Sequence, residues 1–237
     1  MPHPRIFLLL FLIGLLSGCG GSSVYAPVSD VSVIERIPQQ GKHRVLPGET
    51  LYSIAWRYGL DYRYLAVLNH IAPPFSIKVG QVIYLKKRAA IQKIRKAASD
   101  QAVAQSFYVP EFETVIPVTY WQWPARGPII DYYGGLNKGI NIAGSLGQTI
   151  YAAAAGKVVY SNTGLRGYGK LIIIKHNNSF LTAYAHNNRV WVKEGTIVKS
   201  GQKIADMGDT GAKRVMLHFE IRRNGQPVNP LFYLNGH

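Results

Sequence analysis

The sequence predicts a multidomain, mainly β protein in which a small β-α-α-β module precedes a larger antiparallel β-sheet domain. The chain has 237 residues, enough for two small domains and a linker. Glycine is abundant, with 24 residues, and 15 of the aromatic residues are tyrosine, a mixture that favours strands and turns over a helical bundle. Short apolar runs separated by glycine turns recur over residues 120–234, which predicts antiparallel strands with little helix.

The charge of the chain is strongly positive, with 27 Lys and Arg residues against 12 Asp and Glu residues and a formal net charge of +15. Such a balance attracts polyanions. Because the N-terminus has the features of an export signal, we expect no nucleic-acid partner. Anionic lipid surfaces and the carboxylates of a cell wall are the expected polyanions.

Residues 1–18 have the pattern of a secretory signal peptide, in which a basic start precedes an apolar run too short to span a membrane as a helix. The run ends in Leu-Ser-Gly-Cys at residues 16–19, and Cys19 is the single cysteine, so it has no internal disulfide partner. This ending resembles the cleavage box of bacterial lipoproteins and implies lipidation of Cys19. Gly20, in place of an aspartate, implies an outer-membrane anchor. The alternative is an ordinary signal peptide whose cysteine is incidental.

A compact module is predicted at residues 42–87, after a flexible glycine- and proline-containing tether at residues 19–41. A short strand leads to Thr50, which suits the N-cap of a helix that Gly59 ends. A second helix is expected over residues 62–69, and the module closes with a second strand. The expected order is β-α-α-β.

This module resembles a LysM domain, a family that binds N-acetylglucosamine-containing glycans in a shallow groove. The shared residues are Val45, Pro47, Gly48, Glu49, Thr50, Leu51, Ile54, Ala55, Leu68, Asn69, Ile77, Gly80, Gln81 and Ile83. The resemblance implies peptidoglycan as a partner and a groove formed by Gly48, Glu49, Thr50, Asn69, Phe75 and Ile77. The alternative is that these residues only build the small domain.

The connector, residues 88–119, is predicted to be a basic, proline-containing linker. Residues 86–100 hold six Lys and Arg residues and one acid, and their alanine content favours a solvated helix. Two roles are open for this segment, a soluble spacer or a contact with anionic lipid or glycan carboxylates.

The C-terminal domain, residues 120–237, resembles the M23 (LytM-type) peptidase family over nearly its whole length. The resemblance implies an antiparallel sheet fold of the duplicated hybrid motif type. It rests on motifs in family order, namely Lys138 to Ile140, Ala152 to Gly156, Tyr168-Gly169, His176, Tyr184 to His186, Gly195, Gly201-Gln202, Gly208, Thr210-Gly211, Leu217 to Arg222 and Asn229-Pro230.

The zinc site of active M23 members is degenerate in this sequence. In those members a histidine and an aspartate four residues apart, with the second histidine of a His-x-His strand, hold the metal. The corresponding positions are Asn137, Asn141 and His218. The first histidine of the strand corresponds to Met216, and an assisting histidine is retained as His186.

Asparagine offers a neutral amide oxygen, which is a poor zinc ligand compared with imidazole or carboxylate. Without the ion, bound water is not activated near neutral pH. The sequence therefore predicts no catalytic residue, no cofactor and no metal. Two alternatives remain for His186 and His218, a weak zinc-binding pair or purely structural histidines.

The order of lipoprotein signal, LysM domain, basic linker and degenerate LytM domain resembles the murein hydrolase activators of the NlpD type. That resemblance implies a non-catalytic activator of a periplasmic N-acetylmuramoyl-L-alanine amidase, acting at the division septum. The alternatives are a residual zinc metalloendopeptidase and a structural tether between outer membrane and wall. The expected amidase contacts are Tyr132, Tyr133, Asn137, Asn141, Arg166, Tyr168, Tyr184 and His186.

Overall fold

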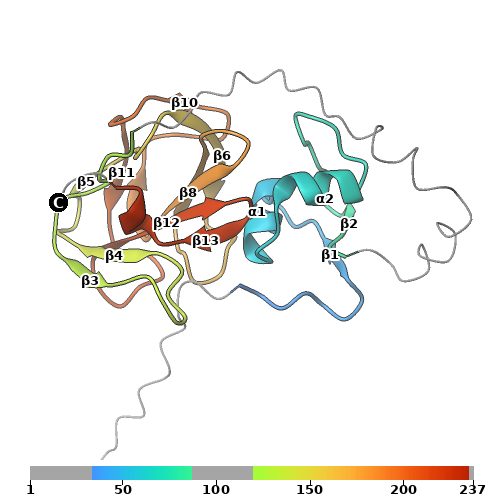
Figure 1. The fold of residues 1–237 in the computed structure, drawn as a ribbon, viewed down its shortest axis with the longest axis horizontal. Helices are drawn as coiled ribbons and strands as arrows, with labels where there is room; N and C mark the ends of the chain where they lie inside the picture. The colour runs from blue at the N-terminus through green and yellow to red at the C-terminus, as the bar shows by residue number, and fades with distance from the viewer. Residues whose placement is uncertain (1–33, 87–119, 235–237) are drawn as a thin grey trace, which may run out of the picture.

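The computed structural model describes residues 34–86 and 120–234, which form a small helical module beside a larger β domain (Figure 1). The predicted lipidation site Cys19, the tether before residue 34 and the connector at 88–119 lie outside the described residues. Within the described part of the chain, every helix is too short or too polar to cross a membrane.

The small module has the predicted β-α-α-β order, which is confirmed as β1 (Lys42–Arg44), α1 (Leu51–Arg57), α2 (Tyr62–Leu68) and β2 (Val82–Tyr84). The two strands pair antiparallel, with Lys42 opposite Tyr84. Residues 34–41, the end of the expected tether, lie against this module, because the Glu35 amide donates to the Arg57 carbonyl at 2.9 Å.

Local hydrogen bonds fix both ends of α1. The Thr50 hydroxyl accepts from the Ser53 amide at 3.1 Å, and the Thr50 amide donates to the Ser53 hydroxyl at 2.9 Å, which together make a capping box. At the other end Gly59 takes a positive φ of 61°, and the Leu60 amide returns to the Ala55 carbonyl at 2.9 Å. This is a Schellman ending, and it explains why a glycine follows the helix.

The larger domain holds an eight-stranded antiparallel sheet and a three-stranded one. The large sheet has the order β10-β6-β7-β8-β12-β4-β3, with β13 beside β12, and the small sheet has the order β5-β11-β9. The elements are β3 (Ile129–Asp131), β4 (Ile140–Ala143), β5 (Thr149–Tyr151), β6 (Gly156–Asn162), β7 (Leu171–Lys175), β8 (Phe180–Ala185), β9 (Asn187–Val190), β10 (Ile197–Val198), β11 (Lys203–Met207), β12 (Met216–Arg223), β13 (Gln226–Val228) and the 3-10 turn η1 (Pro230–Phe232).

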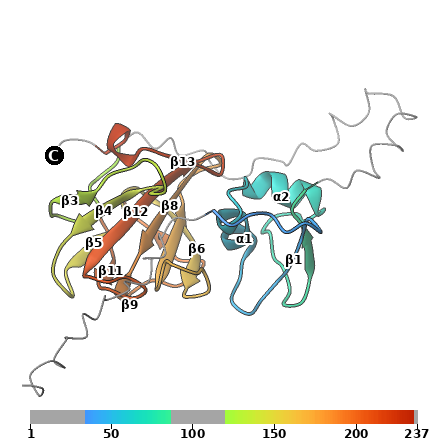
Figure 2. The ribbon, with the colours of Figure 1, turned by 90° about the horizontal axis from the view of Figure 1, so that it is seen from below.

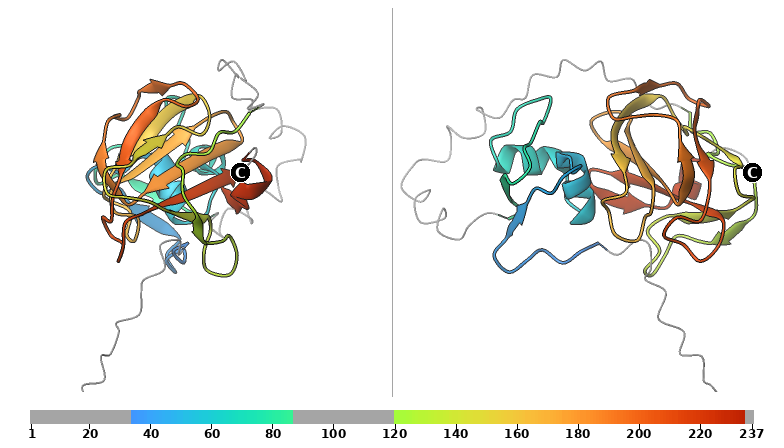
Figure 3. Two further views of the ribbon diagram at one scale, coloured as in Figure 1. Left: turned by 90° about the vertical axis from the view of Figure 1, so that its left-hand side faces the viewer. Right: turned by 180° about the vertical axis from the view of Figure 1, so that it is seen from behind.

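Strand β7 is covered on both faces, which accounts for its unbroken apolar sequence. Ile172 and Ile174 belong to the core shared with the small sheet, whereas Leu171 and Ile173 belong to a second core that continues into the LysM module. Alternate residues of a strand point to opposite faces, so both faces of this sheet are buried. Figures 2 and 3 show the module docked with α1 next to the large sheet.

Polar contacts surround this apolar junction. The Thr50 hydroxyl donates to the Val159 carbonyl of β6 at 3.2 Å, and the Gln226 side chain donates to the Gly59 carbonyl at 2.9 Å. Because a polar group buried without a partner is costly, these hydrogen bonds favour one docked arrangement of the two domains.

Candidate functional site: the former metal cleft

Strands β4 and β12 bring the degenerate ligand positions together. Their antiparallel register places His218 opposite Asn141, and on its other side His218 pairs with Ala185 at the end of β8. The next residue, His186, adopts a left-handed backbone with φ 64° and packs its ring 6.3 Å from that of His218. Three of the predicted site positions therefore meet at the ends of adjacent strands.

Asn141 and His218 contact each other directly. Nδ1 of His218 donates to Oδ1 of Asn141 at 2.7 Å, and the Asn141 amide nitrogen donates to Asp131 at 3.3 Å, which orients the amide. Zinc holds nitrogen and oxygen ligands at about 2.0–2.2 Å in a tetrahedral arrangement, which separates two ligands by roughly 3.4 Å. The observed distance of 2.7 Å is shorter than this separation. A hydrogen bond therefore joins the two side chains at the positions where the family has two metal ligands.

The other two degenerate positions have local roles. The Asn137 amide nitrogen donates to the Tyr132 carbonyl at 3.1 Å, and its oxygen accepts from the Gly139 amide at 3.1 Å, so this side chain closes the turn between β3 and β4. Met216 is buried at the start of β12 and offers a thioether without an exchangeable proton. These donors do not fit a catalytic zinc ion.

One ring nitrogen of His186 is buried without a partner among the described residues. Nδ1 donates to the Thr210 carbonyl at 2.8 Å, and within the described residues Nε2 has no hydrogen-bond partner. Burial, with a smaller contribution from His218, lowers the pKa of His186 to about 4. The ring is therefore neutral at neutral pH, and its Nε2 is buried.

Below His218 lies a buried carboxylate, Glu220, with three partners. It accepts from Tyr168 at 2.7 Å and from Arg222 at 3.0 Å, and His218 Nε2 lies 3.1 Å away. Burial alone raises the pKa of a carboxyl group, but Arg222, His218 and Tyr168 lower the pKa of Glu220 below its ordinary value. Glu220 is therefore ionised and fully paired.

This polar chain continues into the LysM module. Arg222 donates to the Trp56 carbonyl at 2.7 Å, and the Trp56 indole N–H donates to the Tyr168 hydroxyl at 3.2 Å. The sequence did not predict this series of buried polar contacts. Its signal was the spacing of His218, Glu220 and Arg222, since alternate strand residues share one face of a sheet.

The eight predicted amidase contacts divide by exposure. Tyr132 is 61% exposed and Arg166 is exposed, whereas Tyr133 and Asn137 are half-buried. The others, Asn141, Tyr168, Tyr184 and His186, are buried. The structure also exposes 64% of Leu136, an apolar residue of the same turn as Tyr132 that the sequence reasoning did not select. The accessible residues near the former metal position therefore lie in this turn, and Arg166 is exposed on the loop after β6.

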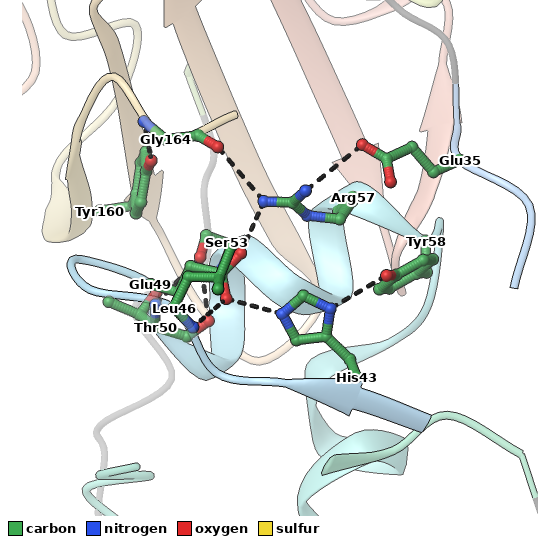
Figure 4. A network of polar contacts seen from close by, with 10 residues as sticks. All are labelled: Glu35, His43, Leu46, Glu49, Thr50, Ser53, Arg57, Tyr58, Tyr160 and Gly164. Atoms are coloured by element: carbon green, nitrogen blue, oxygen red, sulfur yellow. Dashed lines mark hydrogen bonds and ion pairs between the residues drawn. The ribbon is translucent and has the colours of Figure 1, made fainter. Parts of the chain in front are cut away.

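The predicted glycan residues of the LysM module also divide. Figure 4 shows the Glu49 carboxylate inside the module, with His43 and Arg57 each 2.6 Å away. Asn69 is likewise engaged, because it donates to the carbonyls of Leu65 and Tyr84 and accepts from the Tyr84 amide.

The remaining predicted glycan residues lie at the junction or on the loop before β2. Thr50 caps α1 and reaches β6, and Gly48 lies so near Asn162 that a Cβ would approach its amide within 2.3 Å. Phe75 and Ile77 are half-buried on the loop before β2. Gly48 and Thr50 therefore contact the sheet domain, whereas Phe75 and Ile77 remain partly accessible.

Among residues 34–86 and 120–234, no group of three or more His, Cys, Asp or Glu side chains is arranged to hold a metal ion.

Comparison with known proteins agrees with both resemblances. The model of peptidase family M23 matches residues 135–230, and the LysM domain model matches residues 43–86.

The lipoprotein NlpD/LppB homolog of Pseudomonas aeruginosa is 42% identical over 93% of this chain and 88% of its own length. The lipoprotein YgeR of Escherichia coli is 40% identical over 97% and 92%. The murein hydrolase activator NlpD of Escherichia coli is 39% identical over 81% and 67%. The chain therefore belongs to the NlpD family of lipoproteins, with a LysM domain and an M23 peptidase-like domain.

Proposed function

We propose that this chain is a non-catalytic activator of a periplasmic N-acetylmuramoyl-L-alanine amidase. In this account Cys19 anchors it in the outer membrane, the LysM domain binds peptidoglycan, and the protein is enriched at the division septum. Two kinds of similarity support the proposal. Relatives carry the name murein hydrolase activator, and a family model identifies the LysM domain.

The observation that carries the proposal is the 2.7 Å hydrogen bond between Asn141 and His218. Catalytic zinc sites use three imidazole, thiolate or carboxylate ligands and an open position for water. Here two of the three positions are amides, and the remaining imidazole is engaged by Asn141 and Glu220. Hydrolysis by the family's metal route is therefore not expected of this domain.

The turn next to the former metal position has features of a binding surface. Tyr132 and Leu136 project from the turn between β3 and β4, beside the buried pair Asn141 and His218. Exposed aromatic and aliphatic side chains next to a groove suit the apolar face of a helix from a partner. We therefore assign the amidase contact to this turn.

A dye-release assay with labelled peptidoglycan tests the proposal. A zinc-loaded amidase from the same envelope is measured alone and with the purified chain, and the chain is also measured alone with zinc. We expect a higher amidase rate with the chain and no release by the chain alone. Release by the chain alone contradicts the proposal. Failure to accelerate any amidase from the same envelope also does so, and continued glycan binding would then favour a structural tether.

The competing metallopeptidase function draws on one observation, the buried Nε2 of His186, which has no hydrogen-bond partner among the described residues. A histidine pair alone is a weak zinc site, because structural and catalytic sites use at least three protein ligands. Elemental analysis that found tight, equimolar zinc in the purified chain would favour this function instead.

A further inference from the structure

A cavity of about 370 Å³ lies at the junction of the two domains, away from the former metal cleft. One wall consists of Tyr52 on α1 and the loop at residues 73–76 of the LysM module. The opposite wall consists of residues 157–159 of β6, Lys175 of β7 and the turn at residues 194–195. Its volume is in the range of small-molecule sites, which begin at about 300 Å³.

The LysM wall of this cavity is aromatic. Tyr52 packs 4.6 Å from Tyr62 and 6.1 Å from Phe75, measured between ring centroids. Phe75 has a left-handed backbone with φ 65°, a rare and unfavourable conformation for a bulky residue that is found preferentially at functional sites. Flat rings with one apolar face and nearby hydroxyl groups suit the stacking of sugar rings.

The sheet-domain wall is charged. It presents Lys157, which is exposed, and Lys175, whose ammonium nitrogen lies 6.0 Å from the centre of the Tyr62 ring. One acid, Glu194, lies on the same wall, and burial raises its pKa although Lys157 partly opposes this shift. Lys157 is the exposed cation of this wall, and its ammonium group can pair with an anionic group on the ligand.

We propose that this cavity binds a glycan of N-acetylated amino sugars that carries a carboxylate, with both domains contributing to the site. A sugar ring stacks on Tyr52 and Phe75, and Lys157 pairs with the carboxylate. This inference rests on the proposed binding of peptidoglycan. It adds that the LysM groove is completed by the sheet domain, which selects acidic over neutral strands.

Contacts next to the cavity hold its two walls together. The hydrogen bond from Thr50 to the Val159 carbonyl and the close approach of Gly48 to Asn162 hold the start of α1 against β6. A glycan that enters the cavity between these contacts therefore meets both walls, Lys157 included, without any rearrangement of the two domains.

Calorimetric titration of the full-length chain with three glycans tests the inference. The probes are chitohexaose, which is neutral, a glycan strand stripped of its peptides, which carries lactyl carboxylates, and a peptide-bearing strand of equal length. The variants are Lys157→Ala, Phe75→Leu, which keeps an apolar side chain without the ring, and Lys213→Ala. Lys213 is an exposed lysine of the same domain outside the cavity and serves as the control.

We expect Lys157→Ala to weaken the binding of acidic strands about fivefold, which corresponds to the loss of one solvent-accessible ion pair. The affinity for chitohexaose should be unchanged. Phe75→Leu should weaken all three glycans. A loss with stripped strands identifies the sugar carboxylate as the partner, and a loss confined to peptide-bearing strands identifies the peptide.

If Lys157→Ala matches Lys213→Ala with every glycan that the wild type binds, the shared site is wrong and LysM binding stands. If the wild type binds none of the three glycans, both the site and the proposed peptidoglycan binding fail. Amidase stimulation, which is measured separately, then decides the remainder of the proposed function.

Discussion

Arg222 of the sheet domain lies over the indole ring of Trp56 in the LysM module, with the guanidinium carbon 3.6 Å from the ring centre. The same side chain donates to the Trp56 carbonyl at 2.7 Å and to Glu220 at 3.0 Å, and Glu220 in turn contacts His218. A continuous set of buried polar contacts therefore runs from the LysM module to the former metal position. The LysM module, a glycan-binding fold, is in this way part of the environment of the cleft.

Replacing Arg222 by methionine should destabilise the protein strongly. The variant keeps an apolar stem but leaves the buried Glu220 carboxylate without its cationic partner, which costs about 3–5 kcal/mol. The neighbouring exposed Arg223 is the matched control, and Arg223→Met should change the unfolding free energy by less than about 0.5 kcal/mol. Urea denaturation measures both. If both variants lose the same small amount of unfolding free energy, Arg222 does not stabilise the buried Glu220 carboxylate.

Gly225→Ala should loosen the docked domains. Its added Cβ would lie 2.5 Å from the Leu60 carbonyl group of the LysM module, and its φ is 80°. Gly147 has nearly the same φ, 82°, with open space around it, so Gly147→Ala has the same backbone strain without the clash. Small-angle scattering should report a larger radius of gyration for Gly225→Ala alone. Identical scattering from the two variants would contradict the docked arrangement.

Much of the fold could be predicted because its determinants are local. The cap at Thr50 and the glycine at position 59 fix α1 by contacts within a few residues, and the apolar run Leu171–Ile174 indicates a strand buried on both faces. What covers the outer face of that strand could not be predicted. The LysM module is separated from it by dozens of residues, and no local pattern shows which surface it chooses.

The predicted sites show the same division. The spacing of the M23 motif was enough to select Asn141 and His218, but not to show that they hydrogen-bond to each other. Glu49 and Asn69 fit the pattern of a glycan groove, yet their polar atoms have partners inside the module. A residue name does not distinguish a side chain that is available to a ligand from one whose hydrogen bonds are already made.

The stability of the sheet domain should fall between neutral and mildly acidic pH. Burial lowers the pKa of His176 and of His186 to about 4, from an ordinary value of 6.5. The unfolded chain therefore binds protons in this window that the folded chain does not. The stabilising contribution of the two neutral histidines is fully present above pH 6.5. It is lost as the pH falls toward 4, and the free energy of unfolding then decreases by roughly 3 kcal/mol for each histidine.

Urea denaturation at pH 7.5 and at pH 5 measures this loss. His176→Gln should reduce the difference between the two pH values, because it removes one of the two imidazoles whose pKa burial lowers. His70→Gln, at an exposed histidine of the LysM module, should leave the difference unchanged. A wild-type protein equally stable at both pH values would contradict the buried, neutral state of these rings.

Restoring the family's ligands should restore metal binding. The double variant Asn137→His and Asn141→Asp supplies two ligands to join His218, which completes the three that a catalytic zinc site uses. Elemental analysis after dialysis should find about one zinc per chain in this variant and a small fraction of that in the wild type. Equimolar zinc in the wild type would show that its present side chains hold the metal after all.

The central claim is that the sheet domain activates an amidase without hydrolysing peptidoglycan itself. Amidase-dependent dye release with matched tyrosine variants tests this claim most directly. Tyr132 is 61% exposed beside the cleft, and Tyr151 is 40% exposed on β5 of the small sheet. We predict that the wild type and Tyr151→Ala accelerate the amidase equally, and that Tyr132→Ala lowers the stimulation about tenfold, as the loss of an aromatic anchor does. Full stimulation by Tyr132→Ala would contradict the assignment of the amidase contact to this turn, and dye release by the chain without an amidase would contradict the claim itself.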